Sequence, residues 1–251
     1  MKFYMFKLKH ILLYTFGVGA LCVCVWLSAT VLPAAGTVRR LPIYSVDTPE
    51  KTIALTFDCA WGDTDTDAIL KLLDTYGVKA TFFITGDYAD RCAESVKKFH
   101  NAGHEIANHS DMHPHVNQLS AEALTADTEK CSEKLAALTG TRPTLYRAPY
   151  GEYNDRVVDT VNALGYSFIQ WDCDSLDYKS PSAAEMQKRV LDKVQNGSIL
   201  LFHTGTDNTA SALGGILAAL GERGYTFKPV GQLIYKEGFV IDHTGRQRKA
   251  Q

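Results

Sequence analysis

The stretch Ile53-Ala54-Leu55-Thr56-Phe57-Asp58 joins a short apolar run to a carboxylate that follows it directly. Four of the first five residues are apolar, which indicates a strand that is buried on both faces. Similar runs recur along the chain at 80–84, 105–107, 145–147, 166–171 and 199–202. A series of such runs is typical of a buried parallel sheet.

Segments with helical periodicity separate these runs. Ser120 is placed to cap a helix that Gly140 ends, and Ser182 and Gly197 bracket another. Repeated alternation of strand and helix predicts parallel strands with right-handed crossovers, arranged as an open sheet or a barrel. No glycine-rich dinucleotide motif follows the first strand, so chemistry is expected from the loops at the carboxyl ends of the strands.

Polar residues occur at those strand ends. They are Asp58, His109 and His113, Arg147, Asp174 and Asp177, and His203. Strand ends that lie far apart in sequence converge on one mouth of a barrel, so these side chains are expected around a shared cleft. Carboxylates, imidazoles and a guanidinium together are typical of a hydrolase site.

The N-terminus has the pattern of a membrane anchor. Lys2, Lys7 and Lys9 precede a stretch with no charged side chain before Arg39. This stretch exceeds the ~20 residues that span a bilayer as a helix, and the basic flank favours a cytoplasmic N-terminus. Small residues between 28 and 36 also fit a signal-peptidase site, but the stretch is longer than a secretory apolar region of about 7 to 15 residues, which favours an uncleaved anchor.

The rest of the chain is long enough for one domain with a large core. We predict a cytoplasmic stub and transmembrane anchor at 1–38, a linker at 39–50, one extracytoplasmic domain at 51–236 and a polar tail at 237–251. The net charge of −2 gives no electrostatic case for nucleic acid. Two of the six cysteines lie in the apolar stretch and no CxxC occurs among the others, so no disulfide framework is predicted. A monomer is expected.

Five short motifs occur in one order between about residues 50 and 235. They are Thr56-Phe57-Asp58, His109-Ser110-Asp111-Met112-His113, Arg147-Ala148-Pro149-Tyr150-Gly151, Asp174-Ser175-Leu176-Asp177-Tyr178 and Leu201-Phe202-His203. With them the chain resembles the polysaccharide deacetylases of the NodB homology type, carbohydrate esterase family four. The resemblance implies an α/β fold, a distorted (β/α) barrel of about seven parallel strands. It also implies removal of acetyl groups from the amino sugars of a cell-wall polysaccharide such as peptidoglycan or chitin. The opening at 57–62, together with the anchor, is similar to the sporulation-associated branch.

The resemblance and the chemistry of the side chains suggest a role for each motif residue. Asp58 would act as general base and His203 as general acid, with Asp177 holding His203 and Arg147 orienting Asp58. The backbone N–H of Tyr150 would face the oxyanion. The remaining motif residues and their neighbours would wall the substrate pocket; these are Asp174, Tyr178, Leu201 and Trp171.

A divalent metal, most simply zinc, is expected on His109 and His113, because neutral imidazoles at this spacing suit it. The family resemblance implies a second aspartate after the base, but this chain has Cys59 there. Its thiolate could be the third ligand. Alternatively Cys59 packs in the core, and either Asp63 or Asp65 replaces it or the metal is weak or absent.

Two other functions are consistent with the sequence. Cys59 raises the alternative of a membrane-tethered glycan-binding module that has lost catalysis, although a binding cleft has no need for both Asp58 and His203. The same fold could also hydrolyse another non-peptide C–N bond.

Overall fold

The computed structural model describes residues 40–250, so the predicted anchor lies outside the described residues. Within residues 40–250, no helix has the length and apolar character needed to cross a membrane.

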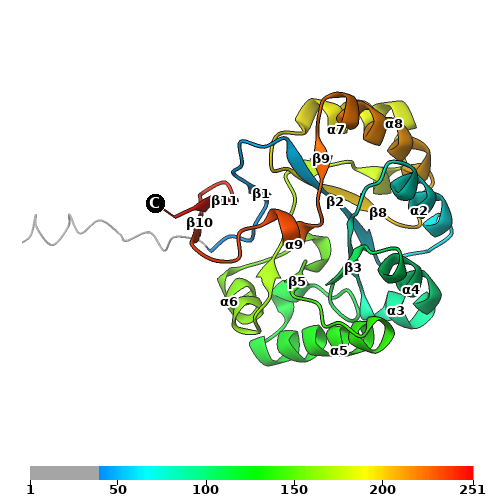
Figure 1. Cartoon of the computed structure of the whole chain (residues 1–251). Coiled ribbons are helices and arrows are strands. Elements are labelled where there is room, and N and C mark those ends of the chain that lie inside the picture. Colours follow the sequence, from blue (N-terminus) through cyan, green and yellow to red (C-terminus); the bar gives the residue numbers. More distant parts are fainter. Residues whose placement is uncertain (1–39, 251) are drawn as a thin grey trace, which may run out of the picture. The chain divides into compact units, whose positions relative to one another are not determined.

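A curled parallel sheet lies at the centre of the domain (Figure 1). Seven strands follow the order β6-β5-β4-β3-β2-β8-β7, and β9 pairs with β2 outside this path. The strands are β2 Thr52–Cys59, β3 Thr81–Ile84, β4 Glu105–Asn108, β5 Leu145–Tyr146, β6 Ser167–Phe168, β7 Cys173–Asp174, β8 Ile199–His203 and β9 Thr226–Phe227. This confirms the predicted α/β arrangement of about seven parallel strands.

Helices lie around the outside of the sheet (Figure 1). They are α2 Thr66–Thr75, α3 Gly86–Arg91, α4 Ala93–Asn101, α5 Ala121–Thr139, α6 Asp155–Ala163, α7 Ala183–Lys193, α8 Thr209–Glu222 and the short α9 Val230–Leu233. Both predicted caps are present: Ser120 Oγ accepts a hydrogen bond from the N–H of Ala123, and Ser182 forms a reciprocal capping box with Glu185.

The predicted strand at 166–171 is shorter in the structure, where only Ser167–Phe168 form β6, which pairs with β5 at one edge of the sheet. A second short strand, β7, follows the predicted run at Cys173–Asp174 and pairs with β8 at the other edge. Residues 169–172 cross between these edges. Ile43 lies in the gap: its N–H donates to the carbonyl of Phe168 (2.8 Å), and its carbonyl accepts from the N–H of Gln170 (2.7 Å). The N-terminal segment therefore closes the gap between the two edges.

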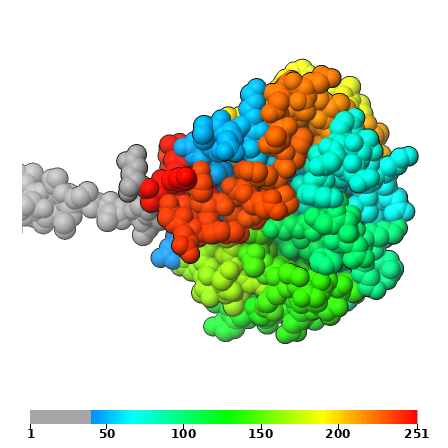
Figure 2. All heavy atoms as spheres, viewed as in Figure 1, coloured from blue at the N-terminus to red at the C-terminus, as the bar shows by residue number. Residues whose placement is uncertain are grey.

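The C-terminal residues are folded onto the domain. The sequence predicts a polar tail at 237–251, whereas the structure has two antiparallel strands there, β10 Phe239–Ile241 and β11 Arg246–Lys249. β11 also pairs with β1, Ser45–Val46, which lies in the predicted linker. Figure 2 shows the corresponding blue and red segments side by side.

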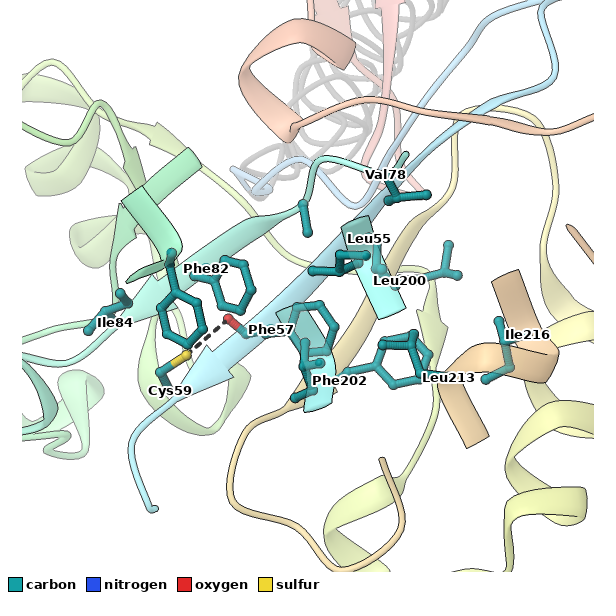
Figure 3. Close-up of a cluster of buried hydrophobic side chains, with 14 of the residues drawn as sticks. Leu55, Phe57, Cys59, Val78, Phe82, Ile84, Leu200, Phe202, Leu213 and Ile216 are labelled. Atoms are coloured by element: carbon teal, nitrogen blue, oxygen red, sulfur yellow. Dashed lines mark hydrogen bonds between the residues drawn. The ribbon is translucent and has the colours of Figure 1, made fainter. Parts of the chain in front are cut away.

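The largest cluster of buried side chains lies between the sheet and the outer helices. Phe57 stacks on Phe82, with ring centroids 5.0 Å apart, and both belong to this cluster (Figure 3). Successive side chains of a strand point to opposite faces. The outward residues of β2 therefore build this core, and the residues between them face the interior of the curled sheet.

Candidate active site

Asp58 lies near the carboxyl end of β2, where its side chain is buried at 4% exposure. Its Oδ1 accepts a hydrogen bond from Arg147 Nη1 at 2.6 Å, and its Oδ2 lies 3.5 Å from His109 Nε2. Burial alone would raise the pKa of this carboxyl, but the charge and hydrogen bond of Arg147, together with the charge of His203, outweigh burial and lower it. The carboxylate is therefore held in the ionised form that a general base requires.

Arg147 is fully buried behind Asp58. Besides Asp58, its guanidinium donates to Thr56 Oγ1 (2.9 Å) and to the carbonyl of Gln170 (3.1 Å), and it lies over the ring of Phe83. Burial lowers the pKa of Arg147, but a guanidinium remains charged in proteins. These contacts fix the guanidinium and so fix the direction of the Asp58 carboxylate.

His203 ends β8 directly opposite Asp58 in the strand register. Its Nδ1 lies 2.6 Å from Asp177 Oδ1, and Asp177 Oδ2 accepts both the N–H of His203 (2.6 Å) and the hydroxyl of Thr209 (2.7 Å). Burial lowers the pKa of His203, but the hydrogen bond and charge of Asp177 outweigh burial and raise it. The structure therefore favours the imidazolium form, which can act as an acid.

His109 and His113 lie together, with ring centroids 5.1 Å apart. His109 Nδ1 is 2.8 Å from the carbonyl of Arg147; because a carbonyl only accepts, Nδ1 carries the hydrogen and Nε2 is left with its lone pair. Burial lowers the pKa of His109, and it lowers the pKa of His113 to about 4. Both rings are therefore neutral at pH 7, as metal ligands must be.

Cys59 does not join the histidines. Its sulfur lies in the outer hydrophobic core, where the thiol points toward the carbonyl of Phe57 (Figure 3). Since β2 continues through Cys59, the Cys59 side chain points away from Asp58. Burial raises the pKa of this thiol well above its ordinary value, which disfavours a thiolate. Of the two alternatives for Cys59, this placement favours packing in the core over ligation of a metal.

Neither of the alternative carboxylates completes a metal site. Asp63 accepts a hydrogen bond from Ser95 Oγ (2.8 Å), and Asp65 accepts one from the N–H of Gly205 (2.8 Å). Among residues 40–250, no group of three or more histidine, cysteine or carboxylate side chains is arranged to hold a metal ion. The donors present therefore fit a cation bound by two histidines and not a site with three protein ligands.

Asp58, His109, His113 and His203 line a cleft of about 340 Å³. The other predicted site residues also line it, namely Tyr150, Trp171, Asp174, Tyr178 and Leu201. Trp171 Nε1 donates to Asp174 Oδ2 at 3.3 Å, which joins two of them. Tyr150 is 60% exposed at the rim and has a left-handed backbone, with φ of 58°. Of the predicted site residues, only Cys59 and the buried pair Arg147 and Asp177 are not on the wall of the cleft.

Sequence reasoning missed Trp61 and His115. The indole of Trp61 stacks on His203, with centroids 5.0 Å apart and planes inclined by 22°. His115 stacks on Tyr150, with centroids 4.5 Å apart, and its Nδ1 lies 2.7 Å from Glu152. An aromatic side chain three residues after the base was a signal for Trp61, whereas nothing in the pattern around His115 distinguished it.

The chain belongs to the polysaccharide deacetylase family, carbohydrate esterase family four. A model of polysaccharide deacetylases matches residues 45–169. A peptidoglycan-N-acetylglucosamine deacetylase of Bacillus cereus is 34% identical over 199 residues, which cover 76% of this chain and 92% of that protein. The peptidoglycan-N-acetylmuramic acid deacetylase PdaA of Bacillus subtilis is 30% identical over 198 residues, 77% of this chain and 75% of PdaA.

Other relatives are longer than the shared region. The uncharacterized protein YlxY of Bacillus subtilis is 30% identical over 193 residues, 77% of this chain but 60% of YlxY. Solved structures agree with the fold. PdaA superposes with a TM-score of 0.73 at 28% identity, covering 76% of this chain and 84% of that one. A family-four pseudoenzyme from Bacillus anthracis superposes with a TM-score of 0.74 at 31% identity, covering 76% and 68%.

Proposed function

We propose that this protein is a hydrolase that removes N-acetyl groups from the amino sugars of a cell-wall polysaccharide, peptidoglycan in particular. The placement of Asp58 and His203 carries the proposal. They lie opposite each other on neighbouring strands, and their surroundings shift their pKa values in opposite directions. Two titratable groups in one cleft whose pKa values are shifted in opposite directions can work as a base and an acid at the same pH.

The chemistry follows from these two groups. Asp58 takes a proton from a water whose oxygen attacks the carbonyl carbon of the acetamide. The C–N bond then breaks, and the imidazolium of His203 gives its proton to the departing nitrogen, so acetate and a free amine are formed. Arg147 keeps Asp58 ionised, and Asp177 keeps His203 oriented and protonated. The N–H of Tyr150 is our candidate donor to the oxyanion.

We also propose that His109 and His113 hold one divalent cation, zinc in the first instance. Their neutral state, their proximity and the free Nε2 of His109 support it. A bound cation of this kind polarises a carbonyl and acidifies water.

The proposed substrate and location rest on further observations. The names of the Bacillus cereus and Bacillus subtilis relatives support peptidoglycan as the substrate. The charge-free stretch before Arg39 supports a domain that is anchored in the membrane and lies outside the cytoplasm. That stretch, together with the opening at 57–62, supports a role in spore formation.

A glycan-binding module without catalysis is the second candidate. The position of Cys59 in the core favours it, because no third metal ligand is left among the described residues. The similarity to a Bacillus anthracis pseudoenzyme favours it too.

Acetate release separates the two candidates. The full chain would be incubated with peptidoglycan, its muropeptides and chitin oligomers, and acetate and product mass would be followed. The deacetylase proposal expects acetate and a product lighter by one acetyl group, both lost in Asp58→Asn. Glycan binding without acetate release would establish the binding module. Release of a different fragment would indicate another C–N hydrolase.

A further inference from the structure

Tyr150 combines a strained backbone with a side chain that lies at the rim of the cleft. Its φ is 58° and its ψ is 8°, in the left-handed region that a residue with a side chain seldom occupies. Such a conformation costs free energy and persists only where the surrounding contacts impose it. The contacts around Tyr150 therefore help to set the direction of its backbone N–H.

Two imidazole rings contact the side chain of Tyr150. The ring of His113 meets the Tyr150 ring edge-on, and the ring of His115 stacks on it with the planes inclined by 15°, each at a centroid distance of 4.5 Å. Ring pairs at this distance attract each other beyond the effect of the area they bury. Because Tyr150 is 60% exposed, its side chain is held by these rings at the surface and not by the core.

The ring of His115 is itself held in place. His115 Nδ1 lies 2.7 Å from Glu152 Oε1, and because a carboxylate only accepts, Nδ1 donates the hydrogen bond. Glu152 belongs to the same loop as Tyr150, whereas His115 belongs to the loop after β4. Arg156 on α6 also holds the loop after β4, because its Nη2 donates to the carbonyl of Asn117 at 2.9 Å. The two loops are thus joined beside the Tyr150 ring.

The peptide that follows Tyr150 is fixed from the other side. Gln170 Nε2 donates to the carbonyl of Gly151 at 3.2 Å. Gly151 also approaches Trp171 so closely that a Cβ at this position would lie 3.0 Å from the indole atom Cη2. With its side chain and the following peptide both held, Tyr150 keeps its φ, and its N–H keeps one direction.

We propose that His115 is a positioning residue for the oxyanion donor: stacked on Tyr150 and held by Glu152, it keeps the N–H of Tyr150 aimed at the acetamide oxygen. This inference rests on the proposed function, because it takes that N–H as the donor to the oxyanion. His115 is not one of the described residues that line the cleft, so it acts through Tyr150. A donor that is aimed in advance stabilises the charge of the transition state more than it strengthens binding of the substrate.

The first test separates the rate of reaction from binding of the substrate. The full chain would be given muropeptides and chitin oligomers, and acetate release would give kcat and KM. His115→Ala should lower kcat about tenfold, less than the ~10² to 10³-fold cost of losing an oxyanion donor outright, and should leave KM and metal content unchanged. His115→Phe keeps a ring for Tyr150 to stack on and should restore most of the rate. His243→Ala, at an exposed position, is the control and should leave kcat unchanged.

The second test measures stabilisation of the oxyanion directly. An oligomer in which a methylphosphonamidate replaces the acetamide carries a charged, tetrahedral group that resembles the intermediate. Its affinity should fall about tenfold in His115→Ala, in parallel with kcat, while the affinity for the unmodified oligomer stays the same. Glu152→Ala should reduce the affinity for the analogue, whereas Glu152→Gln keeps an acceptor for His115 Nδ1 and should preserve it.

Three results would overturn the proposal. One is an unchanged kcat in folded His115→Ala. Another is a raised KM with an unchanged kcat, because His115 would then contact the substrate. The third is loss of metal from His115→Ala, which would place His115 in the metal site.

The role of His115 can be tested even if the unaltered chain releases no acetate, in which case the proposed function fails. The three-bond coupling between the amide and Hα protons of Tyr150 reports φ and is measured by NMR on protein labelled at tyrosine. It should change in His115→Ala and stay as it is in His115→Phe. A coupling that is unchanged in His115→Ala would show that His115 does not set the backbone of Tyr150, and the proposal would be wrong.

Discussion

Asp58 and His203 occupy paired positions on β2 and β8, and each has one dominant buried partner, Arg147 for the base and Asp177 for the acid. Neither partner needs to touch substrate. Each acts by fixing the protonation state of the group beside it. This division of roles makes the pH dependence of the reaction a sensitive measure of the assignments.

The pH profile of activity should have an acid limb and an alkaline limb, so that activity falls at both low and high pH. The base must be ionised, so activity falls as pH drops through the lowered pKa of Asp58; the acid must be protonated, so activity falls as pH rises through the raised pKa of His203. Asp177→Asn removes the charge that raises the pKa of His203, and the alkaline limb should move to lower pH. A kcat/KM profile measures the shift. An alkaline limb that stays in place would show that His203 is not the acid.

Removing either catalytic group should cost far more than shifting its pKa. We expect Asp58→Asn and His203→Ala each to lower kcat by ~10² to 10⁴-fold, the usual contribution of a general base or acid. Circular dichroism would establish that each variant is folded, and His243→Ala, at an exposed position, serves as the control. Near wild-type turnover by either folded variant would disprove the role of that residue.

At the scale of elements, β2 separates catalysis from packing by the alternation of its side chains. Asp58 faces the cleft and Cys59 faces the outer core. Cys59→Ala should therefore lower the free energy of unfolding by about 1 kcal/mol through a small cavity. Cys173→Ala, at another buried thiol of the same core, should behave alike.

Metal content should depend on the residues that face the cleft and not on those that face the outer core. Elemental analysis of protein purified without a metal-affinity tag should find zinc retained in Cys59→Ala and lost in His109→Ala, because His109 presents a ring nitrogen to the cleft whereas the thiol of Cys59 lies in the outer core. Loss of zinc in Cys59→Ala would mean that the strand end rearranges when metal binds.

The elements differ in how far the sequence predicts them. β2, β3 and β8 are continuous buried runs, and α5 and α7 begin at recognisable caps, so pattern alone finds them. β6 and β7 have two residues each, too few for any periodicity, and they pair with β5 and β8 at opposite edges of the sheet, which no local pattern reveals.

The sequence also predicts the candidate site only in part. Strand ends predict which side chains converge. That β2 extends through Cys59, which turns this side chain outward, depends on its pairing with β3, where Cys59 lies opposite Ile84. The position of Trp61 depends on Arg91, 30 residues away along the chain, and no local pattern reveals that contact.

At the scale of the whole molecule, the two ends of the described chain hold each other. β11 pairs with β1, and the side chain of Gln247 on β11 is fully buried. Gln247 Nε2 donates a hydrogen bond to the carbonyl of Tyr235, and Gln247 Oε1 accepts one from the N–H of Tyr235, each at 2.8 Å. Gln247→Ala leaves those backbone groups without partners and should lower the free energy of unfolding by about 1 to 3 kcal/mol. Thermal or denaturant unfolding measures it, with exposed Arg248→Ala as the control; equal effects of the two would contradict a structural role for Gln247.

The domain is predicted to lie outside the cytoplasm. A charge-free stretch after Lys9, flanked by lysines on its N-terminal side, should insert as a helix with the domain outside the cytoplasm. A wall glycan is found only there, so the proposed substrate requires this topology. Reporters fused after residue 40 test it: one that works only after export should be active, and one that works only in the cytoplasm should be silent. Changing Lys2, Lys7 and Lys9 to glutamine should weaken this bias, because the orientation depends on the basic flank. The reverse reporter pattern in the unaltered chain would refute the topology, and the domain would then have no access to a wall substrate. The assignments of the acid and the base would still be decided by their own tests.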